Sequence, residues 1–426
     1  MRNVERQGLL LGLVCSASAL AGSAFNISVG VALPLWQQKF HMDAFAIGIL
    51  PTVFLLSNAI GNLLGGHVAA RIGNRIMFQH MVLVLAVGNV VVLCAGNQLV
   101  LCIGLIIGGL SVGLETPAVL ATISECVATE RRGRVISVVD GMGLTGLVIP
   151  QGIAFFSSGV GEASITIVFA ANALIGLLVW LIRNYHQGFI TMMASMKEGS
   201  QNNQNNSGLS RVEHVSNGLM AGMTSHHLWY PTVLLTCFLL FWMIPANTWG
   251  AFLNYYFITI GGRSQSFATS NAFIANIIGV LFVFLIYRRF VDTKYRYIMM
   301  YTGLAMCTIA LAINAIFGGQ WQVFTACYYV YCAFNMIHGN PIYRVWSQQI
   351  MPTAYKALIV GATTFIVQVS AALFGLVTPL LMQNLPELLL WLLVSCLIIC
   401  GVFAGAMMRY IQRKRISDPV FTAQLV

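Results

Sequence analysis

The length of its apolar runs is the feature that most constrains this chain. A helix needs about 20 apolar residues to cross the hydrocarbon core of a bilayer, and the sequence has twelve runs of that kind. Transmembrane strands are shorter and alternate in polarity. We therefore expect an all-α polytopic membrane protein with twelve transmembrane helices, at approximately 8–32, 44–68, 77–96, 99–123, 135–158, 164–182, 230–258, 267–287, 297–317, 321–347, 357–382 and 387–408.

The charge of the chain fits a membrane protein better than a nucleic-acid-binding one. Only 8% of the residues are charged and 58% are hydrophobic, yet the net charge is +10. With both termini in the cytoplasm, nineteen of the 22 Lys and Arg residues fall on that side, Arg183 among them, as the positive-inside rule requires. Lys39 and Arg263 fall outside, and Arg344 lies within a span. The expected partner is the lipid bilayer, with no nucleic acid, and the compact loops favour the plasma membrane (inner membrane) of a bacterium.

The hydrophobic pattern is interrupted near the middle of the chain, where residues 187–228 include the polar run QNNQNNSG. Such a segment is typical of a linker. We predict an N-terminal six-helix half at 1–186, a cytoplasmic linker at 187–228, a C-terminal half at 229–410 and a cytoplasmic tail at 411–426. The ten cysteines show no zinc-like spacing, so no metal and no cofactor are expected.

An internal repeat supports the division into two halves. Residues 115–133 align without gaps to residues 339–357, so that Pro117 falls on Pro341 and Arg132 on Lys356. Duplicated helical halves are typical of transporters, which bind their substrate near the bilayer midplane at the interface of the repeats.

Four stretches resemble those of a known family. They are GHVAARIGNR (66–75), DTKYR (292–296), the segment 105–133 and QQIMPTAYK (348–356). They resemble the loops and helix ends of major facilitator superfamily (MFS) transporters, in particular those of the sugar porters. Ala70 and Gln349 depart from the family pattern, which has acidic residues there. The resemblance implies the MFS fold of two pseudo-symmetric halves and secondary transport by alternating access.

The charged residues of these stretches are candidates for a cytoplasmic gate. Carboxylates and guanidinium groups at helix ends can form charge-assisted contacts that hold one face of a transporter closed. The open alternative is that they are solvated charges that set the topology. The candidates are Arg71, Arg75, Glu125, Arg132, Asp292, Arg296 and Lys356.

Polar side chains within the spans are candidates for a substrate cavity, the alternative being hydrogen bonds between helices. The resemblance places Asn26 where proton-coupled sugar porters have an Asp, and Phe241 and Trp242 where they have paired glutamines. Fewer amides favour a substrate with an apolar or aromatic portion over a typical hexose. The candidates are Asn26, Trp242, Asn247, His338, Asn340 and Gln368.

Two carboxylates, Glu115 and Asp140, fall within the spans. A charged group at membrane depth is functional by default. The rise per residue puts Glu115 about 15 Å, Asp140 about 10 Å and Arg344 about 12 Å from the cytoplasmic helix ends. Our hypothesis is that Asp140 and Glu115 share proton coupling and substrate binding, while Arg344 neutralises them or binds a substrate carboxylate. A static buried ion pair that stabilises helix packing is the alternative.

These features predict a secondary active transporter of a small polar or anionic solute, a sugar or organic acid derivative, coupled to protons and acting as a monomer. Efflux of drugs or amphipathic metabolites is an alternative, suggested by the aromatic span 230–258 and the 19 Met residues. A non-transporting membrane sensor is another. We expect no enzyme, because the sequence lacks a nucleophile with a base, a metal cluster or a phosphate-cradling Gly loop.

Overall fold

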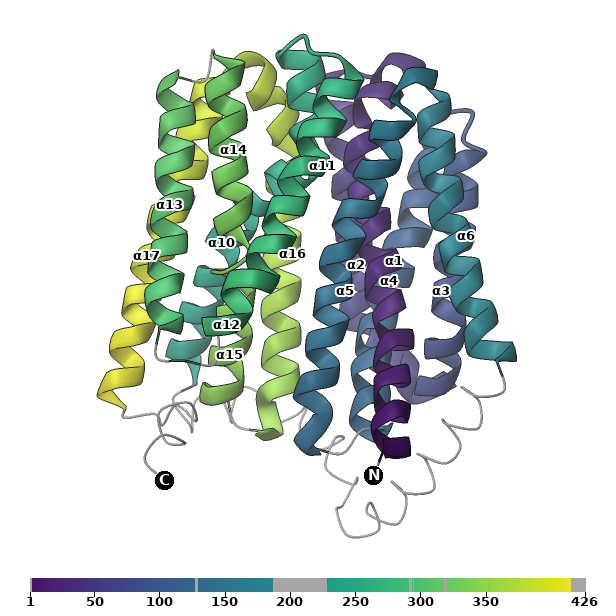
Figure 1. Ribbon diagram of the computed structural model, residues 1–426, viewed down its shortest axis with the longest axis vertical. Coiled ribbons are helices and arrows are strands. Elements are labelled where there is room, and N and C mark those ends of the chain that lie inside the picture. The colour runs from purple at the N-terminus through teal and green to yellow at the C-terminus, as the bar shows by residue number, and fades with distance from the viewer. Residues whose placement is uncertain are drawn as a thin grey trace. The chain divides into compact units, whose positions relative to one another are not determined.

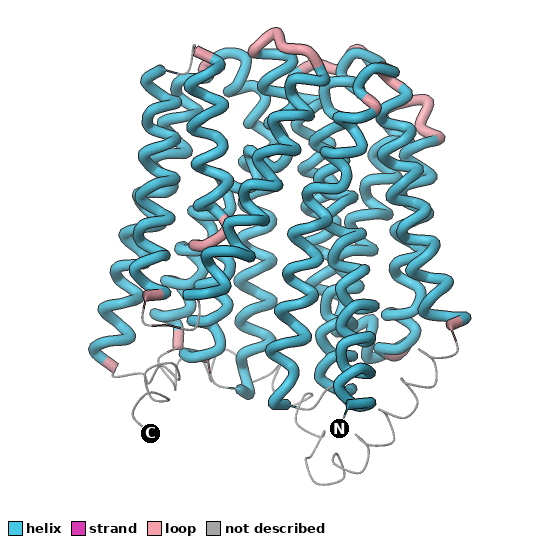
Figure 2. The backbone as a smooth tube through the Cα atoms, viewed as in Figure 1, coloured by secondary structure: helices cyan, strands magenta, loops and turns pink. Residues whose placement is uncertain are grey.

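The computed structural model describes residues 2–126, 129–186, 228–290, 293, 295–317, 320–351 and 353–414. The described chain is helical, with short loops and without strands (Figure 2). It divides into two compact units, Met1–Arg211 and Val212–Val426. Unit 1 contains the helices α1 (Arg2–Phe40), α2 (Ala44–Ile72), α3 (Asn74–Leu93), α4 (Gln98–Cys126), α5 (Thr129–Phe156) and α6 (Ala163–Tyr185), with a 3-10 turn at Ser158–Val160 (Figure 1).

Unit 2 repeats this series with interruptions. It contains α10 (Trp229–Tyr255), continued by a π-helical turn at Tyr256–Ile260, α11 (Gln265–Phe282), continued by a second π-helical turn at Val283–Tyr287, the single turn α12 (Arg288–Phe290), α13 (Arg296–Phe317), α14 (Trp321–Asn335), α15 (Asn340–Ile350), α16 (Thr353–Asn384) and α17 (Pro386–Arg413). Within the described residues, ten helices are long and apolar enough to cross a membrane. The shorter apolar part of α5, 141–156, and the pair α14 and α15 supply the other two of the twelve expected segments.

The expected single helix over 321–347 is in fact two helices. α14 ends at Asn335 and α15 begins at Asn340, with Pro341 in its first turn. Between them Gly339 has φ +75°, a left-handed conformation that glycine adopts at little cost. Proline has no N–H and its ring clashes with the carbonyl four residues earlier. The sequence Gly-Asn-Pro therefore ends one helix and starts the next inside a membrane segment.

The two units pack their helices in the same pattern. In unit 1, α1 packs against α5 and α6, α3 against α4 and α6, and α2 against α4. In unit 2, α10 packs against α16 and α17, α13 against α14 and α17, and α11 against α14. Helices that correspond in chain order thus have corresponding neighbours. The prediction of two pseudo-symmetric six-helix halves is confirmed, while the cytoplasmic placement of the termini stays a prediction.

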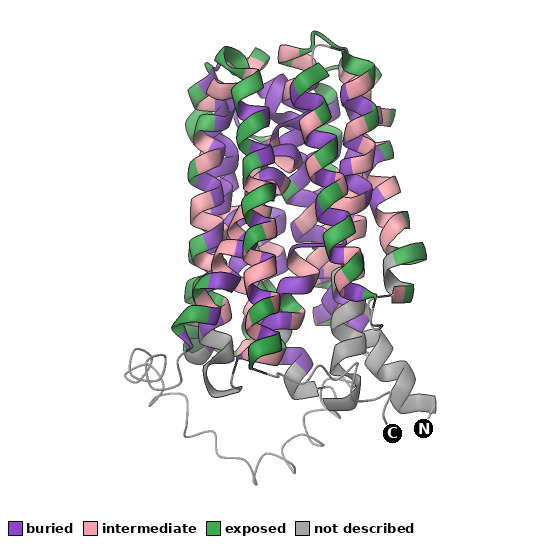
Figure 3. Ribbon diagram, turned by 90° about the vertical axis from the view of Figure 1, so that its left-hand side faces the viewer, coloured by how far each residue is buried: buried purple, intermediate pink, exposed green. Residues whose placement is uncertain are grey.

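The interior of each unit is closely packed, and large apolar residues are exposed on the outward helix faces. Figure 3 shows the buried residues toward the inside and the exposed residues on the outward side of the helices nearest the viewer. Ile309, Ile398 and Val402 are more than half exposed. In a bilayer these side chains contact lipid, so their exposure carries no hydrophobic penalty.

Helices α2 and α4 approach most closely at glycines. A Cβ atom on Gly113 would lie 2.2 Å from the Asn58 carbonyl oxygen, and one on Gly61 would lie 2.7 Å from the Leu110 carbonyl oxygen. These contacts are with backbone, which cannot rotate away as a side chain can. The small residues therefore bring the two backbones together, as in other membrane helix pairs.

We expect Gly113→Ala to separate α2 and α4 and to destabilise the protein by about 1–3 kcal/mol, the usual cost of overpacking a close-packed interior. Thermal unfolding of the detergent-solubilised protein measures the effect. Gly66→Ala is the matched control, because a Cβ atom on Gly66 of α2 meets nothing within 4 Å. Equal stability of the two variants would contradict the close approach.

Candidate functional site

A buried ion pair lies in unit 1 between α4 and α6. The Nη1 of Arg183 donates to the Oε1 of Glu115 over 2.7 Å. Arg183 is 0% exposed and Glu115 is 3% exposed. Water is therefore excluded from both charges, and their attraction is much stronger than that of a pair at the surface.

The same guanidinium group contacts two further helices. Its Nη1 donates to the carbonyl oxygen of Phe78 on α3 over 2.5 Å. Its Nη2 donates to the carbonyl oxygen of Val14 on α1 over 3.2 Å and to the Ser18 hydroxyl. The Phe78 ring lies over the guanidinium, with 3.9 Å between its centroid and Cζ. One side chain of α6 thus binds α1, α3 and α4, and both of its Nη atoms have acceptors.

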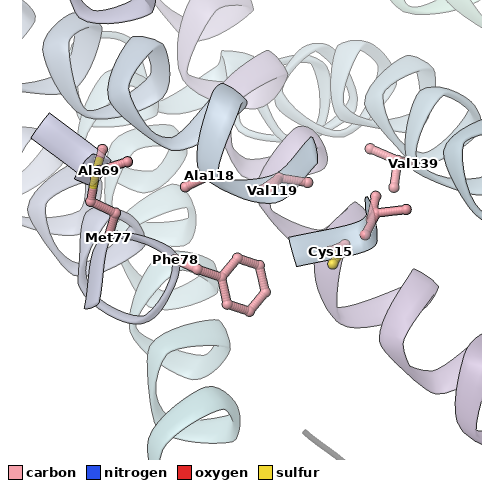
Figure 4. Close-up of a cluster of buried hydrophobic side chains, with 8 residues drawn as sticks. Cys15, Ala69, Met77, Phe78, Ala118, Val119 and Val139 are labelled. Atoms are coloured by element: carbon pink, nitrogen blue, oxygen red, sulfur yellow. The ribbon is translucent and has the colours of Figure 1, made fainter. Parts of the chain in front are cut away.

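An apolar cluster surrounds this contact. Its buried members come from α1 to α5 and are Cys15, Ala69, Met77, Phe78, Ala118, Val119, Ile123 and Val139 (Figure 4). Phe78 belongs both to the cluster and to the contact with Arg183, and Val14 packs against the cluster. The ion pair therefore lies in a low-dielectric part of unit 1, where an unpaired charge would be costly.

The ion pair corrects two expectations from the sequence. Arg183, which was counted among the basic residues of the cytoplasmic side, is fully buried and paired. The partner that neutralises Glu115 is Arg183 and not Arg344. Arg344 is instead an exposed residue of α15. The sequence signal for Arg183 was weak, because a lone arginine at the end of an apolar run is what the positive-inside rule predicts.

A second polar site lies in unit 2 at the break between α14 and α15. The indole ring of Trp242, on α10, packs directly over Gly339, where a Cβ atom would lie 2.3 Å from the ring. Its Nε1 donates to the Oδ1 of Asn335 over 3.0 Å. Trp242 and Asn335 are half-buried. Trp242 was predicted from the sequence as a cavity residue, and Asn335 was not.

His338 lies within the same break and is fully buried. Its Nδ1 is 3.0 Å from the Phe334 carbonyl oxygen, while its Nε2 has no hydrogen-bond partner among the described residues. Two residues further on, Asn340 is half-buried and starts α15, whose first N–H groups have no acceptor within the helix. The break therefore brings amides, an imidazole and free N–H groups beside an indole ring.

The other predicted cavity residues are spread over three helices. Asn26 is exposed on α1 between the buried residues Phe25 and Ile27. Asn247 and Gln368 are half-buried, on α10 and α16 respectively. The side chain of Asp140 lies outside the described part of the structure.

The predicted gate residues are only partly described. Arg71 and Arg75 are exposed at the adjoining ends of α2 and α3. Arg296 is 4% exposed, and its Cζ is 5.1 Å from the Tyr297 ring centroid. Asp292 and the side chains of Glu125, Arg132 and Lys356 lie outside the described residues. The gate therefore stays a prediction.

Comparison with known proteins decides the family. The family model "Major Facilitator Superfamily" matches residues 13–375. The chain belongs to the Major Facilitator Superfamily. It is a multi-pass membrane transporter, and both the predicted fold class and the predicted broad function are confirmed.

Individual relatives and structures agree with this assignment. The chain is 25% identical over 425 residues to the minor myo-inositol transporter IolF of Bacillus subtilis (strain 168), covering 96% of this chain and 93% of that one. It is 20% identical to the quinolone resistance protein NorA of Staphylococcus aureus (strain MRSA252), over 74% of this chain and 76% of that one. The crystal structure of a D-xylose-proton symporter matches with a TM-score of 0.74 at 15% identity, over 92% of this chain and 96% of that chain.

The buried ion pair predicts a large loss of stability when one partner is removed. Glu115→Gln leaves Arg183 buried without its counter-charge, and Arg183→Gln does the same to Glu115. Each should lower the free energy of unfolding by about 3–5 kcal/mol. The double variant Glu115→Gln with Arg183→Gln buries no charge and should recover much of this loss.

Thermal unfolding of the four proteins in one detergent tests this prediction as a double-mutant cycle. Glu162→Gln serves as the control, because Glu162 is an exposed acid at the start of α6. Additive losses in the double variant would show that the two charges do not stabilise each other.

Proposed function

We propose that this MFS member carries a polyhydroxylated solute, a sugar or a cyclitol, in symport with protons across the plasma membrane of a bacterium. The polar break between α14 and α15 is the observation that carries the proposal. Similarity to a myo-inositol transporter along nearly the whole chain supports the substrate class. The solved D-xylose-proton symporter with the same fold supports the mode of transport.

The break has the chemistry that recognition of such a solute requires. A sugar or cyclitol ring has an apolar face of C–H groups and a rim of hydroxyls. The Trp242 indole supplies an apolar surface, while Asn335, Asn340 and the Nε2 of His338 supply hydrogen-bond donors and acceptors. Discontinuous helices form substrate sites in several transporter folds. Asn26, Asn247 and Gln368 are proposed as further hydroxyl contacts, and Arg344 as a contact for a substrate with an anionic group.

Proton coupling is assigned to Asp140. The amide of Asn26 cannot carry a proton, and Glu115 is already paired with Arg183. We therefore propose Asp140, the other carboxylate of the predicted spans, for the transport cycle. Glu115 then serves mainly to hold α4 against α6, which is the alternative of a static buried ion pair that stabilises helix packing. The gate residues on the loops are proposed to open and close the cytoplasmic side.

Efflux of amphipathic compounds is the second candidate function. It is favoured by similarity to a quinolone resistance protein and by the aromatic wall of α10. Phe241 stacks on Phe403 with 6.0 Å between ring centroids, and Trp249 packs edge-on against Phe324 at 5.3 Å. Aromatic surfaces of this kind suit flat hydrophobic cations or quinolones.

The substrate site is tested by Trp242→Phe in proteoliposomes that take up radiolabelled myo-inositol or D-xylose. The variant keeps an aromatic ring and loses the hydrogen bond to Asn335. Asn335 is then no longer held in place for the substrate, and we expect KM to rise roughly fivefold, which corresponds to about 1 kcal/mol of binding free energy. Trp321→Phe is the control, because Trp321 lies at the first residue of α14 and is 38% exposed. Export of ethidium or norfloxacin by the wild type, without uptake of myo-inositol or D-xylose, would decide for efflux.

The coupling role is tested by Asp140→Asn. We expect this isosteric variant to lose accumulation of substrate driven by a pH gradient and to keep substrate exchange at equal pH on the two sides. Exchange needs no net proton movement, so it separates coupling from binding. Glu162→Gln should behave as the wild type. Accumulation by Asp140→Asn at the wild-type level would exclude Asp140 as the coupling residue.

A further inference from the structure

An apolar groove runs along the outer side of unit 2 between α13 and α17. Its volume is ≈ 340 Å³. The Thr308 hydroxyl in its wall is bonded to the Leu304 carbonyl oxygen, so the wall offers no free hydroxyl there. The other apolar walls are formed by Leu304, Ala305, Ile309, Leu397, Ile398 and Gly401.

The groove opens away from the interior of unit 2. Ile309 is 52% exposed and Ile398 is 55% exposed on its rims. Helices α13 and α17 form one edge of unit 2, at the left in Figure 1, and they are on the side that faces the viewer in Figure 3. In a membrane protein an exposed apolar groove on this side is filled by lipid chains or by another protein.

One end of the groove is polar. Tyr301 lines it there, and a Cβ atom on Gly405 would lie 4.0 Å from the Tyr301 hydroxyl. Arg409, one turn further along α17, is exposed and close enough to act electrostatically on that hydroxyl. Among the described residues the ion pair of Glu115 with Arg183 is the only one, so Arg409 has no carboxylate partner there.

The same end carries the marks of a membrane surface. Trp229 and Tyr230 at the start of α10 contact each other with ring centroids 5.8 Å apart, and Tyr230 contacts Tyr410 at 5.7 Å. Arg413 and Lys414 follow at the end of α17. Aromatic belts with basic neighbours lie at the level of the lipid headgroups. Tyr301 and Arg409 are therefore at headgroup depth.

The distance from the far end of the groove to Arg409 matches one leaflet. From Leu397 to Arg409 the rise along α17 is about 18 Å, and half of the hydrocarbon core is about 15 Å. The groove thus begins near the bilayer centre at Leu397, and Arg409 lies at the membrane surface. A lipid acyl chain with its phosphate at the surface has this arrangement.

We propose that the groove between α13 and α17 binds one anionic glycerophospholipid, with an acyl chain between the helices and the headgroup phosphate on Arg409 and the Tyr301 hydroxyl. Guanidinium and phosphate groups form strong charge-assisted bonds, and basic residues at the membrane surface attract anionic lipids. A second copy of this chain is a poorer occupant. In a two-fold dimer through this face, the Arg409 side chains of the two copies would lie near each other and repel.

Native mass spectrometry of the full-length, detergent-purified transporter with added palmitoyl-oleoyl-phosphatidylglycerol or palmitoyl-oleoyl-phosphatidylcholine tests the proposal. We expect one retained phosphatidylglycerol, bound at least tenfold more tightly than phosphatidylcholine. Arg409→Gln should weaken phosphatidylglycerol about tenfold, the loss of one hydrogen bond to a charged group, and leave phosphatidylcholine unchanged. Arg75→Gln, which removes an exposed arginine of α3, should change neither.

A second variant tests the apolar part. A side chain on Gly401 points at Leu304, 3.0 Å from its Cδ2 atom, so Gly401→Leu fills the groove. It should weaken both lipids, whereas Val402→Leu, at a neighbouring position that is 66% exposed, should not. Equal binding of the two lipids, or wild-type binding by Arg409→Gln, would overturn the proposal. The proposal would also be overturned if the lipid-free protein were a dimer that Gly401→Leu dissociates, because the groove would then be an interface between two copies of the chain. If Gly401→Leu fails to fold, the Arg409→Gln comparison decides alone.

Discussion

The structure depends on one constraint, which is that hydrocarbon offers no hydrogen-bond partner to a polar group. Every buried donor and acceptor must then be satisfied within the protein. Helices satisfy the backbone, and small polar side chains bond to the carbonyl one turn back, as Ser28 does to Ala24 and Thr52 to Gly48. Asn172 of α6 donates to Ser28 of α1, so that this hydroxyl both donates and accepts. His338 is one of the described residues with a buried polar atom that has no hydrogen-bond partner, and it lies in the break between α14 and α15.

The two most polar places in the membrane segments solve this constraint in different ways. In unit 1 a charge is buried and both Nη atoms of Arg183 donate to acceptors, which fixes four helices together. In unit 2 the backbone itself leaves the helix between Asn335 and Asn340, and an indole ring covers the opening. The first arrangement leaves little for a ligand to bind. The second leaves the buried Nε2 of His338 without a hydrogen-bond partner beside the half-buried Trp242, Asn335 and Asn340, which is why the substrate site is proposed there.

Much of the fold could be predicted from the sequence, because the apolar runs report directly on membrane depth. The predicted span 164–182 corresponds to the helix Ala163–Tyr185, and the predicted span 387–408 corresponds to the helix Pro386–Arg413. The break in 321–347 was not predicted. In the repeat Pro341 corresponds to Pro117, and α4 continues through Pro117 without interruption. The difference lies in Gly339, which takes a left-handed φ where unit 1 has Glu115.

The site was less predictable than the fold, because it depends on which helices touch. Glu115 was identified from its depth alone, but its partner lies 68 residues away and at the end of a span, where an arginine has a sufficient topological explanation. Asn335 was not predicted, because the sequence around an amide in a long apolar run does not show whether the amide contacts a ligand or a neighbouring helix. Asp140 and most of the gate residues stay predictions.

The ion pair of unit 1 also bears on how the protein is made. Membrane helices are synthesised in order, and N-terminal units assemble first. Glu115 enters the membrane with α4 and has no counter-charge until α6 follows with Arg183. The arrival of α6 therefore completes a set of four helices joined through Arg183. The buried acid of α4 thus gains its counter-charge only when the last helix of its own half is present.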